Sequence, residues 1–211
     1  MDMIIDGKTA FIMTSNFTRS ALGGSTGKSG VINREYDIID SNRQDVQAVI
    51  TIFNADWNHT DAQFNDTNLV VSPVNSRSSF TSLIDSAHKT LLIEAEEMKD
   101  SGIEQAIASA AQRGVRVQVI LPAPSGSLAD SNSQGIGVIK QGSVQVKEDS
   151  RLYMHAKIIV VDGQRAFVGS ENISTQSLDK NRELGIIVSD SNVLTTLEQT
   201  FQHDWSDSQN A

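Results

Sequence analysis

The chain has 211 residues, 38% of them hydrophobic, and its formal net charge at pH 7 is −9. This length and composition allow a sizeable core in one or two domains. The acidic balance disfavours a general nucleic-acid-binding protein, for which a basic stripe is expected, but it does not exclude a nuclease with a local cationic cleft. The sequence contains no cysteine, which excludes disulfides and thiolate zinc sites and fits either redox compartment.

Targeting signals are not apparent in the sequence. No window approaches the roughly 18 apolar residues that a membrane span requires. Residues 1–3 lack the basic and apolar regions of a signal peptide. We therefore expect a soluble chain and assign no compartment, since a targeting segment would be lost together with any missing upstream portion.

Helix and strand patterns alternate along the chain. In chain order we expect a helix over 46–57, a strand over 68–72, a helix over 79–87, a strand over 90–95, a helix over 101–113, a strand over 115–121, a loop over 123–137, strands over 152–161 and 164–168, and a helix over 193–205. Ser101 is expected to cap its helix, with Glu104 as the capping-box partner and Gly114 as the stop. Trp57 and Trp205 are expected to pack between a helix end and the sheet. The strand-helix-strand unit implies a right-handed crossover, so the sequence predicts an α/β fold with a mixed β-sheet flanked by helices.

The turn between the last two expected strands is clearly marked. Asp162-Gly163 is a strong two-residue hairpin signal. With this turn, Val161 is expected to pair with Gln164. That pairing fixes the register and therefore which side chains share a face.

Four polar side chains converge in this register. Lys157 lies opposite Val168 and shares a face with His155. The same register places His155 opposite Ser170, with Asn172 two residues further along that face. An imidazole, an ammonium, a hydroxyl and an amide suit a phosphodiester, because attack at phosphorus builds charge on the non-bridging oxygens. A lone His-x-Lys in a strand is usually a half-exposed polar pair. A catalytic interpretation therefore depends on the residues spaced further along the chain.

The spacing extends well beyond this tripeptide. His155-x-Lys157-(x)4-Asp162 is followed by Gly-Ser-x-Asn at residues 169–172 and then by Glu183. This order resembles the phospholipase D superfamily, whose signature is the HKD motif with a downstream asparagine and glutamate. The resemblance implies a phospholipase D-like fold. Asp162 would complete the catalytic set, although its place in the turn favours a supporting role.

The resemblance also implies roles for these side chains. His155 would be the nucleophile that forms a phosphohistidine. Lys157 and Asn172 would bind the phosphoryl oxygens, assisted by Ser170. Glu183 would accept a hydrogen bond from the other ring nitrogen of His155 and fix its tautomer, as a carboxylate behind an imidazole generally does.

Much of this pattern occurs twice in the chain. The paired segments are 6–11 with 162–167, 16–18 with 172–174, 33–35 with 181–183, and 56–57 with 204–205. We therefore expect the downstream part of a first HKD-type domain at residues 1–66. A complete second HKD-type domain is expected at residues 67–211.

The first copy lacks its own His-x-Lys. Counting back from Asp6 puts Met1 at the place of the lysine and the histidine before the chain begins. By correspondence with the second copy, Thr14 and Asn16 are candidate phosphate-binding residues. Asp6 and Glu35 would support the site.

Superfamily members usually build one active site from two such motifs, in which one histidine attacks phosphorus and the other protonates the leaving group. Three explanations of the missing histidine remain open. The chain is a fragment of a longer enzyme, or two copies pair so that their His155 side chains face each other, or the protein is a degenerate member without catalysis. We favour the fragment, because the first copy keeps residues typical of an active site.

Two other patterns are weaker. Residues 23–29 resemble a phosphate-binding loop, but the first glycine of that motif falls at Leu22 and the strand-to-helix context is missing. Glu94, Glu96 and Glu97 suggest a metal site, yet no paired histidine accompanies them. We expect a strand end with solvent-facing charge there, and no metal.

These observations predict a metal-independent phosphodiester hydrolase or phosphatidyl transferase that acts by double displacement through His155 without a cofactor. The acidic composition favours a phospholipid or small phosphodiester as substrate over nucleic acid. The expected partner is the missing upstream half-domain, or a second chain, that supplies the other His-x-Lys. The alternatives are a homodimeric metal-independent endonuclease and a catalytically inactive phosphate-binding or scaffold domain.

Overall fold

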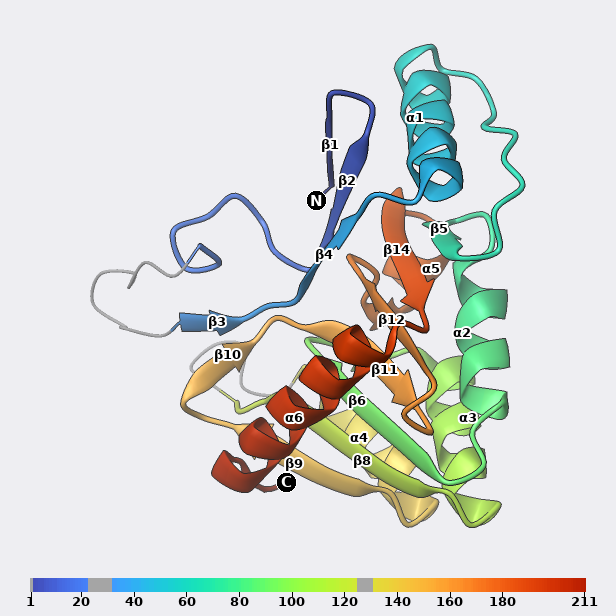
Figure 1. Cartoon of the computed structure of the whole chain (residues 1–211). Coiled ribbons are helices and arrows are strands. Elements are labelled where there is room, and N and C mark those ends of the chain that lie inside the picture. Colours follow the sequence, from blue (N-terminus) through green and yellow to red (C-terminus); the bar gives the residue numbers. More distant parts are fainter. Residues whose placement is uncertain (1, 23–31, 125–130) are drawn as a thin grey trace.

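A computed structural model describes residues 2–22, 32–124 and 131–211. In this part of the chain, eight strands form a mixed sheet in the order β15-β9-β8-β6-β11-β12-β14-β5 (Figure 1). They are β5 (Leu69–Ser72), β6 (Thr90–Ala95), β8 (Arg116–Pro122), β9 (Gln145–Asp149), β11 (Lys157–Val161), β12 (Arg165–Gly169), β14 (Glu183–Val188) and β15 (Gln209–Asn210). The neighbours β6, β8 and β9 run parallel, and the other pairs are antiparallel. The mixed α/β fold expected from the sequence is confirmed.

Smaller sheets and helices surround this sheet. β1 (Met3–Ile5), β2 (Thr9–Met13) and β4 (Asp37–Asp40) form one sheet, β3 (Ile32–Arg34) pairs with β10 (Leu152–Met154), and β7 (Met98–Lys99) pairs with β13 (Ile173–Ser174). The helices are α1 (Arg43–Trp57), α2 (Ser76–Asp85), α3 (Ser101–Gln112), α4 (Ser133–Gln141), α5 (Thr175–Asp179) and α6 (Ser191–Asp207). None of these described helices is both long and apolar enough to cross a membrane.

Helices cover both faces of the large sheet (Figure 1). On one face, Phe80 of α2, Ile103 of α3 and Ile139 of α4 are buried against the strands. On the other face, Leu197 and Phe201 of α6 are buried. Because both faces are covered, β11 is buried at every position, which explains its continuous apolar run in place of an alternating pattern.

The internal repeat of the sequence is also a repeat in space. The hairpin of β1 and β2 has the register of the hairpin of β11 and β12, so that Ile4 and Val160 hold equivalent positions. Both turns have left-handed backbone, with φ of 53° at Asp6 and 54° at Asp162. The two copies share a hydrophobic cluster that includes Ile12 and Leu184. The expected boundary at residue 66 stays a prediction.

Two helices begin differently from expectation. α2 begins at Ser76, before the expected start at residue 79. The cap of α3 is Asp100 and not Ser101, because the Asp100 carboxylate accepts hydrogen bonds from the backbone N–H groups of Gly102 and Ile103, both at 3.1 Å. The capping box predicted at Ser101 is therefore wrong, although the helix itself is confirmed.

The expected loop over 123–137 contains the start of α4, and β9 follows in a stretch to which the sequence assigns no element. Two glycines explain why the sequence did not predict α4. A Cβ atom at Gly135 would lie 2.1 Å from the carbonyl oxygen of Met98, and one at Gly142 would lie 2.6 Å from the backbone of Ala108. These glycines weaken the helical pattern, but they allow α4 to pack closely on β7 and α3.

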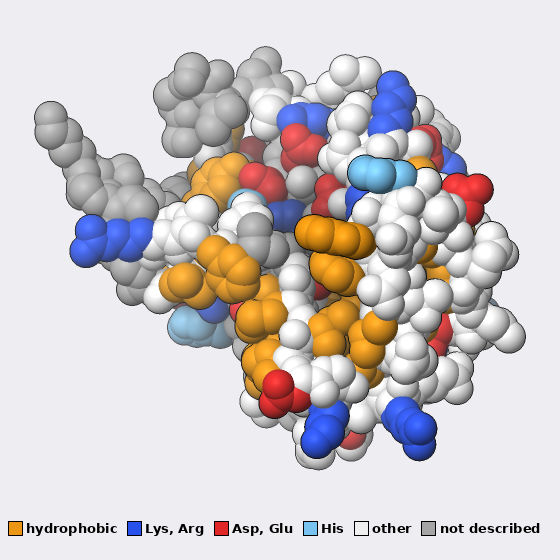
Figure 2. All heavy atoms as spheres, turned by 90° about the horizontal axis from the view of Figure 1, so that it is seen from above, with side chains coloured by type: hydrophobic (Ala, Val, Ile, Leu, Met, Phe, Trp, Pro, Cys, Tyr) orange, Lys and Arg blue, Asp and Glu red, His pale blue; other side chains and the backbone are white. Residues whose placement is uncertain are grey.

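The two tryptophans at equivalent positions differ in burial. Trp57 is 75% exposed and stacks on Phe53 with 6.2 Å between ring centroids, so its expected core packing is wrong. Trp205 is partly buried against Phe201, and Lys147 Nζ lies 4.8 Å from the centroid of its ring. Figure 2 looks onto the end of the molecule that carries α1 and shows hydrophobic side chains grouped on this surface.

Candidate active site

The expected strand over 152–161 is interrupted at His155-Ala156, which separates β10 from β11. The break leaves the His155 side chain 14% exposed, whereas the Lys157 side chain at the start of β11 is 4% exposed. Lys157 Nζ donates to the carbonyl oxygen of His155 at 2.6 Å and lies 3.2 Å from His155 Nδ1. The histidine and lysine of the motif therefore lie together.

The carboxylate against His155 comes from the other copy of the repeat. Glu35 Oε1 lies 2.8 Å from His155 Nδ1. β3 and β10 run parallel, with Arg34 opposite Met154. The residues that follow these two strands, Glu35 and His155, therefore lie beside each other. The expectation that Glu183 contacts His155 is therefore corrected, because strand pairing between the copies brings Glu35 to this place.

Glu35 is held by two further donors. Thr14 Oγ1 donates to its Oε2 at 2.7 Å, and Asn33 Nδ2 donates to its Oε1 at 2.9 Å. Burial alone would raise the pKa of Glu35, but the hydrogen bonds from His155 and these two donors outweigh burial and lower it. A charged carboxylate at Nδ1 favours the tautomer that carries its proton there, which leaves the lone pair on Nε2.

Glu183 has equivalent surroundings in the second copy. Ser170 Oγ donates to its Oε2 at 2.6 Å, and Asn181 Nδ2 donates to its Oε1 at 3.2 Å. Glu183 also lines a pocket of about 350 Å³ together with Ile4 and Arg182. Among the described residues, no histidine contacts Glu183.

The hairpin register differs by one residue from the expected one. Val161 pairs with Arg165, because Gln164 belongs to the turn and donates its N–H to the Val161 carbonyl at 2.9 Å. A shift of one residue turns the side chains of the second strand to the opposite face. Ser170 consequently hydrogen-bonds to Glu183, and the expected convergence of Ser170 on His155 is corrected.

Asp162 anchors the turn at the opposite end of β11. Its carboxylate accepts hydrogen bonds from the backbone N–H groups of His88, Lys89 and Thr90 at 3.0, 2.7 and 2.8 Å. Burial would raise the pKa of Asp162, but these bonds outweigh it and lower the pKa. The full length of β11 separates it from Lys157, which fits the supporting role and not direct chemistry.

The remaining candidates make no described contact with His155. Asp6 and Asn16 are exposed. Asn172 donates its backbone N–H to Ser177 Oγ at 2.9 Å, and its Oδ1 atom is buried without a hydrogen-bond partner in the described structure. Of these three residues, Asn172 alone presents a buried polar group without a partner.

Glu96 contacts His155, although the sequence predicted only a solvent-facing strand end at this position. Its Oε2 lies 3.0 Å from Lys157 Nζ and 3.5 Å from His155 Nε2, while its Oε1 accepts a hydrogen bond from the Tyr153 hydroxyl at 3.0 Å. Its backbone N–H donates to the Ala156 carbonyl at 3.1 Å, at the end of the β6–β11 pairing. The available signal was its position directly after a strand, and only the pairing of that strand with β11 makes it informative.

The glutamates expected at a solvent-facing strand end have three different environments. Glu94 lies in the core, where burial raises its pKa to about 8. Glu96 lies at His155, and Glu97 pairs with Lys99 at 2.8 Å. Within the described ranges, no group of three His, Asp or Glu side chains could hold a metal ion. The phosphate-loop-like segment 23–29 lies outside the described residues.

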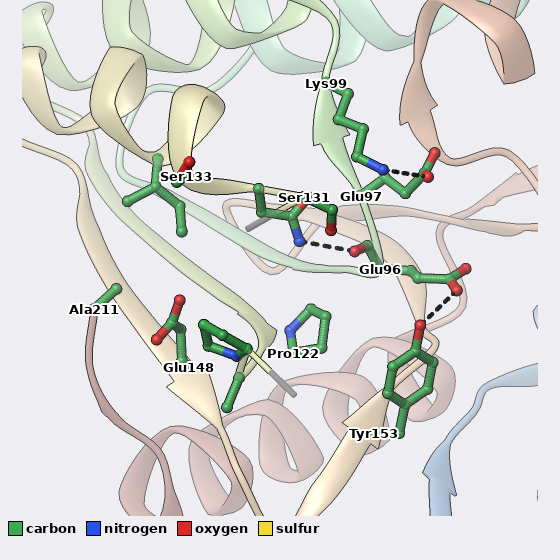
Figure 3. Close-up of a pocket in the computed structure, with 13 residues that line it drawn as sticks. Glu96, Glu97, Lys99, Pro122, Ser131, Ser133, Glu148, Tyr153 and Ala211 are labelled. Carbon is green, nitrogen blue, oxygen red and sulfur yellow. Dashed lines mark hydrogen bonds and ion pairs between the residues drawn. The ribbon is translucent and has the colours of Figure 1, made fainter. Parts of the chain in front are cut away.

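A pocket of about 340 Å³ adjoins Glu96 (Figure 3). Its lining includes Glu97, Glu148, Tyr153 and Pro122. In Figure 3 the Tyr153 hydroxyl points to the Glu96 carboxylate at the border of this pocket. The lining also includes Lys99, so it carries charges of both signs, and it contains the same Glu96 carboxylate that contacts His155.

A family model described as the phospholipase D-like domain of cardiolipin synthase matches residues 80–205. The chain belongs to the phospholipase D-like family. The matched residues contain both His155 and Lys157. Members of this family are phosphodiesterases and cardiolipin synthases, so the chain belongs to a family of enzymes.

Two curated relatives illustrate the family. A probable cardiolipin synthase of Bacillus subtilis is 29% identical over 131 residues, which are 60% of this phospholipase D-like chain and 26% of that protein. The mitochondrial cardiolipin hydrolase of Mus musculus is 35% identical over 97 residues, which are 46% of this chain and 42% of that protein. The similarity therefore spans less than half of each relative.

Two solved structures share the fold of this chain. Nuc, a phospholipase D family member from Salmonella typhimurium, has a TM-score of 0.63 at 22% identity and covers 68% of this chain and 95% of its own. A phosphatidylserine synthase of Haemophilus influenzae has a TM-score of 0.70 at 11% identity and covers 98% of this chain and 61% of its own. The fold shared with the phosphatidylserine synthase therefore extends over nearly the whole chain.

Proposed function

We propose that the chain is a phosphodiester hydrolase or phosphatidyl transferase of the phospholipase D type. The observation that carries this proposal is the position of His155. Glu35 Oε1 lies 2.8 Å from His155 Nδ1, and Lys157 Nζ lies 3.2 Å from the same nitrogen. An imidazole fixed at one nitrogen presents the other as a nucleophile, and an adjacent ammonium can bind the phosphoryl oxygens.

The proposed reaction has two displacements at phosphorus. First, His155 Nε2 forms a bond to phosphorus, and the bond from phosphorus to the leaving alcohol breaks. Lys157 and Asn172 bind the non-bridging oxygens, where negative charge grows. Water or an alcohol then attacks the phosphohistidine and releases His155. Water gives hydrolysis and an alcohol gives transfer, and neither step requires a metal.

The leaving alcohol must receive a proton, and Glu183 suggests where the acid binds. The ion pairs between the copies are reciprocal: Arg34 contacts Asp204, and the equivalent Arg182 contacts Asp56. By the same reciprocity, Glu183 is proposed to accept a hydrogen bond from a second imidazole, as Glu35 does from His155. That imidazole would come from an upstream half-domain or a second chain.

A phospholipid is the favoured substrate class. The named relatives are a cardiolipin synthase and a cardiolipin hydrolase, and the net charge of −9 disfavours extended contact with nucleic acid. Vesicles that contain cardiolipin and a single-stranded DNA would compare the two classes. Conversion of cardiolipin to phosphatidic acid and phosphatidylglycerol, measured by lipid mass spectrometry, is expected, whereas faster cleavage of the DNA would contradict the lipid assignment.

The first prediction concerns His155→Ala. The wild-type chain, mixed with bis(p-nitrophenyl) phosphate in EDTA and quenched in alkali, is expected to carry an adduct on His155 because that ring is the proposed nucleophile. Peptide mass spectrometry measures the adduct, and nitrophenol release measures turnover. The variant should lose both signals.

His203→Ala is the matched control, since its side chain is 71% exposed and outside the site. It should behave as the wild type does. An adduct without sustained turnover would fit the need for a second imidazole. Turnover that survives His155→Ala would contradict the proposed function.

A further inference from the structure

Glu96 stands where Lys157 and His155 would receive an anion. Its Oε2 is 3.0 Å from Lys157 Nζ and 3.5 Å from His155 Nε2. Nε2 is the atom that must reach phosphorus in the function proposed above, and Lys157 would hold a phosphoryl oxygen there. The Glu96 carboxylate and a phosphoryl group therefore compete for Lys157 Nζ and for the position next to His155 Nε2.

The Glu96 carboxyl group is charged at neutral pH. Burial alone would raise its pKa, but the charge of Lys157, together with the hydrogen bonds from Lys157 and Tyr153, holds the pKa below its ordinary value. Two anions this close to each other repel strongly, because the Glu96 side chain is only 20% exposed and solvent screens its charge weakly. Phosphoryl binding therefore requires the carboxylate to leave its present position.

The structure provides room for that movement. Glu96 lines the pocket of about 340 Å³ described above, and its Oε1 accepts a hydrogen bond from Tyr153 at the border (Figure 3). Its backbone is fixed by the 3.1 Å hydrogen bond to the Ala156 carbonyl. Rotation of the side chain alone can therefore carry the carboxylate from Lys157 into the pocket.

We propose, on the basis of the function proposed above, that Glu96 is a resident anion of the phosphoryl subsite and a determinant of its charge selectivity. With no substrate bound, it occupies the subsite and neutralises Lys157. A phosphodiester displaces the Glu96 carboxylate and brings a single negative charge close to it. A phosphomonoester or inorganic phosphate carries nearly two charges at pH 8, so Glu96 opposes its binding more strongly and favours diesters.

The test compares inorganic phosphate with dimethyl phosphate at pH 8, with binding measured by calorimetry on the full chain. Glu96→Gln is expected to bind inorganic phosphate at least about tenfold more tightly than the wild type, the effect of one like charge within a few ångströms. The gain for dimethyl phosphate should be several times smaller. A gain of affinity cannot arise from a damaged fold.

Two further variants locate the effect. Glu97→Gln removes the same charge from the neighbouring residue, which pairs with Lys99 outside the His155 cluster, and should change either affinity less than about twofold. Lys157→Ala should abolish the gain when combined with Glu96→Gln. Equal gains from Glu96→Gln and Glu97→Gln would overturn the proposal, since they would reflect net charge alone.

The outcomes separate this inference from the proposed function. Unchanged or weaker phosphate binding by Glu96→Gln overturns the inference, and it leaves the function intact if the wild type still forms the His155 adduct. A Glu96→Gln variant that forms that adduct more slowly without a gain in affinity overturns it too, and would indicate a proton donor. Absence of the adduct from both proteins would instead contradict the proposed function.

Discussion

The partner of His155 shows how one residue contact depends on long-range pairing. Glu35 and Glu183 occupy equivalent positions in the two copies, and each accepts hydrogen bonds from a hydroxyl and an asparagine of its own copy. Sequence spacing cannot distinguish them as partners of His155. The parallel pairing of β3 with β10 decides, because it brings Glu35 beside the histidine.

Glu35→Gln is therefore expected to impair the nucleophile. An amide can neither fix the Nδ1–H tautomer as firmly nor stabilise the positive charge that the ring acquires. The turnover number with bis(p-nitrophenyl) phosphate should fall about 100-fold, at the lower end of effects for groups that act through a catalytic imidazole. Nitrogen-15 NMR of the histidine rings should also show a mixed tautomer at His155.

Glu183→Gln is the informative comparison, since the motif resemblance places Glu183 at His155 and the structure does not. This variant should leave the ring resonances of His155 unchanged. A tautomer change in Glu183→Gln and none in Glu35→Gln would contradict the described geometry.

At the scale of elements, Asp100 joins three helices. It caps α3, its carboxylate accepts hydrogen bonds from Arg77 of α2 at 2.7 and 2.9 Å, and Thr175 of α5 donates to it at 2.6 Å. The hydrogen bonds from Arg77 outweigh burial and lower the pKa of Asp100 to about 2. Its position explains how α2, α3 and α5 meet on one side of the sheet.

Asp100→Ala should lower the free energy of unfolding by about 2 kcal/mol, because it removes a helix cap and charge-assisted hydrogen bonds. Urea denaturation at pH 7 measures this loss. Ser101→Ala, at the cap expected from the sequence, should change the unfolding free energy by less than about 0.5 kcal/mol. A larger loss for Ser101→Ala than for Asp100→Ala would contradict the capping geometry.

The stabilisation by Asp100 should also depend on pH. A carboxyl with a lowered pKa contributes stability that is fully present above its unfolded value of about 3.9 and disappears as the pH falls through the folded value. The folded value here is about 2. The difference between wild type and Asp100→Ala should therefore be constant from pH 7 to about pH 5 and shrink below about pH 4.

The elements that the sequence predicts are those with strong local patterns. β6, α3 and α6 have continuous or amphipathic apolar runs, and they occur close to their expected bounds. α4 was missed, because Gly135 and Gly142 serve contacts with other elements. The hairpin register was missed by one residue, because Asp162-Gly163 does not reveal that Gln164 joins the turn. The sequence predicted that His155 and Lys157 lie together, but the contact of Glu96 with them depends on the pairing of β6 with β11.

At the scale of the whole molecule, arginine–aspartate ion pairs connect the two copies within the described residues. Arg34 binds Asp204 through Nε at 2.5 Å and Nη2 at 2.7 Å, and the Asp204 side chain is 2% exposed. Arg182 binds Asp56 at 2.9 Å, and both of these side chains are more than one-third exposed. The buried pair lies at the end of β3, directly before Glu35, so it supports the active site as well as the fold.

Arg34→Met should therefore destabilise the protein by about 3 kcal/mol, because it leaves a buried carboxylate without its partner. It should also reduce formation of the His155 adduct, since β3 positions Glu35. Arg182→Met, the equivalent change at the exposed pair, should cost about 1 kcal/mol or less. Urea denaturation and adduct yield measure both effects, and equal losses for the two variants would contradict the difference in burial.

The reciprocity of these pairs has a consequence for how such a molecule can change. When residue i of one unit contacts residue j of another, and j of the first contacts i of the second, the interface is that of a two-fold symmetric dimer of identical subunits. Here that symmetry lies within a single polypeptide, where a mutation in one copy is not duplicated in the other. One ion pair includes a buried carboxylate, and the other lies at the surface. Within one polypeptide, equivalent positions of the two copies can therefore differ, as the burial of these two ion pairs does.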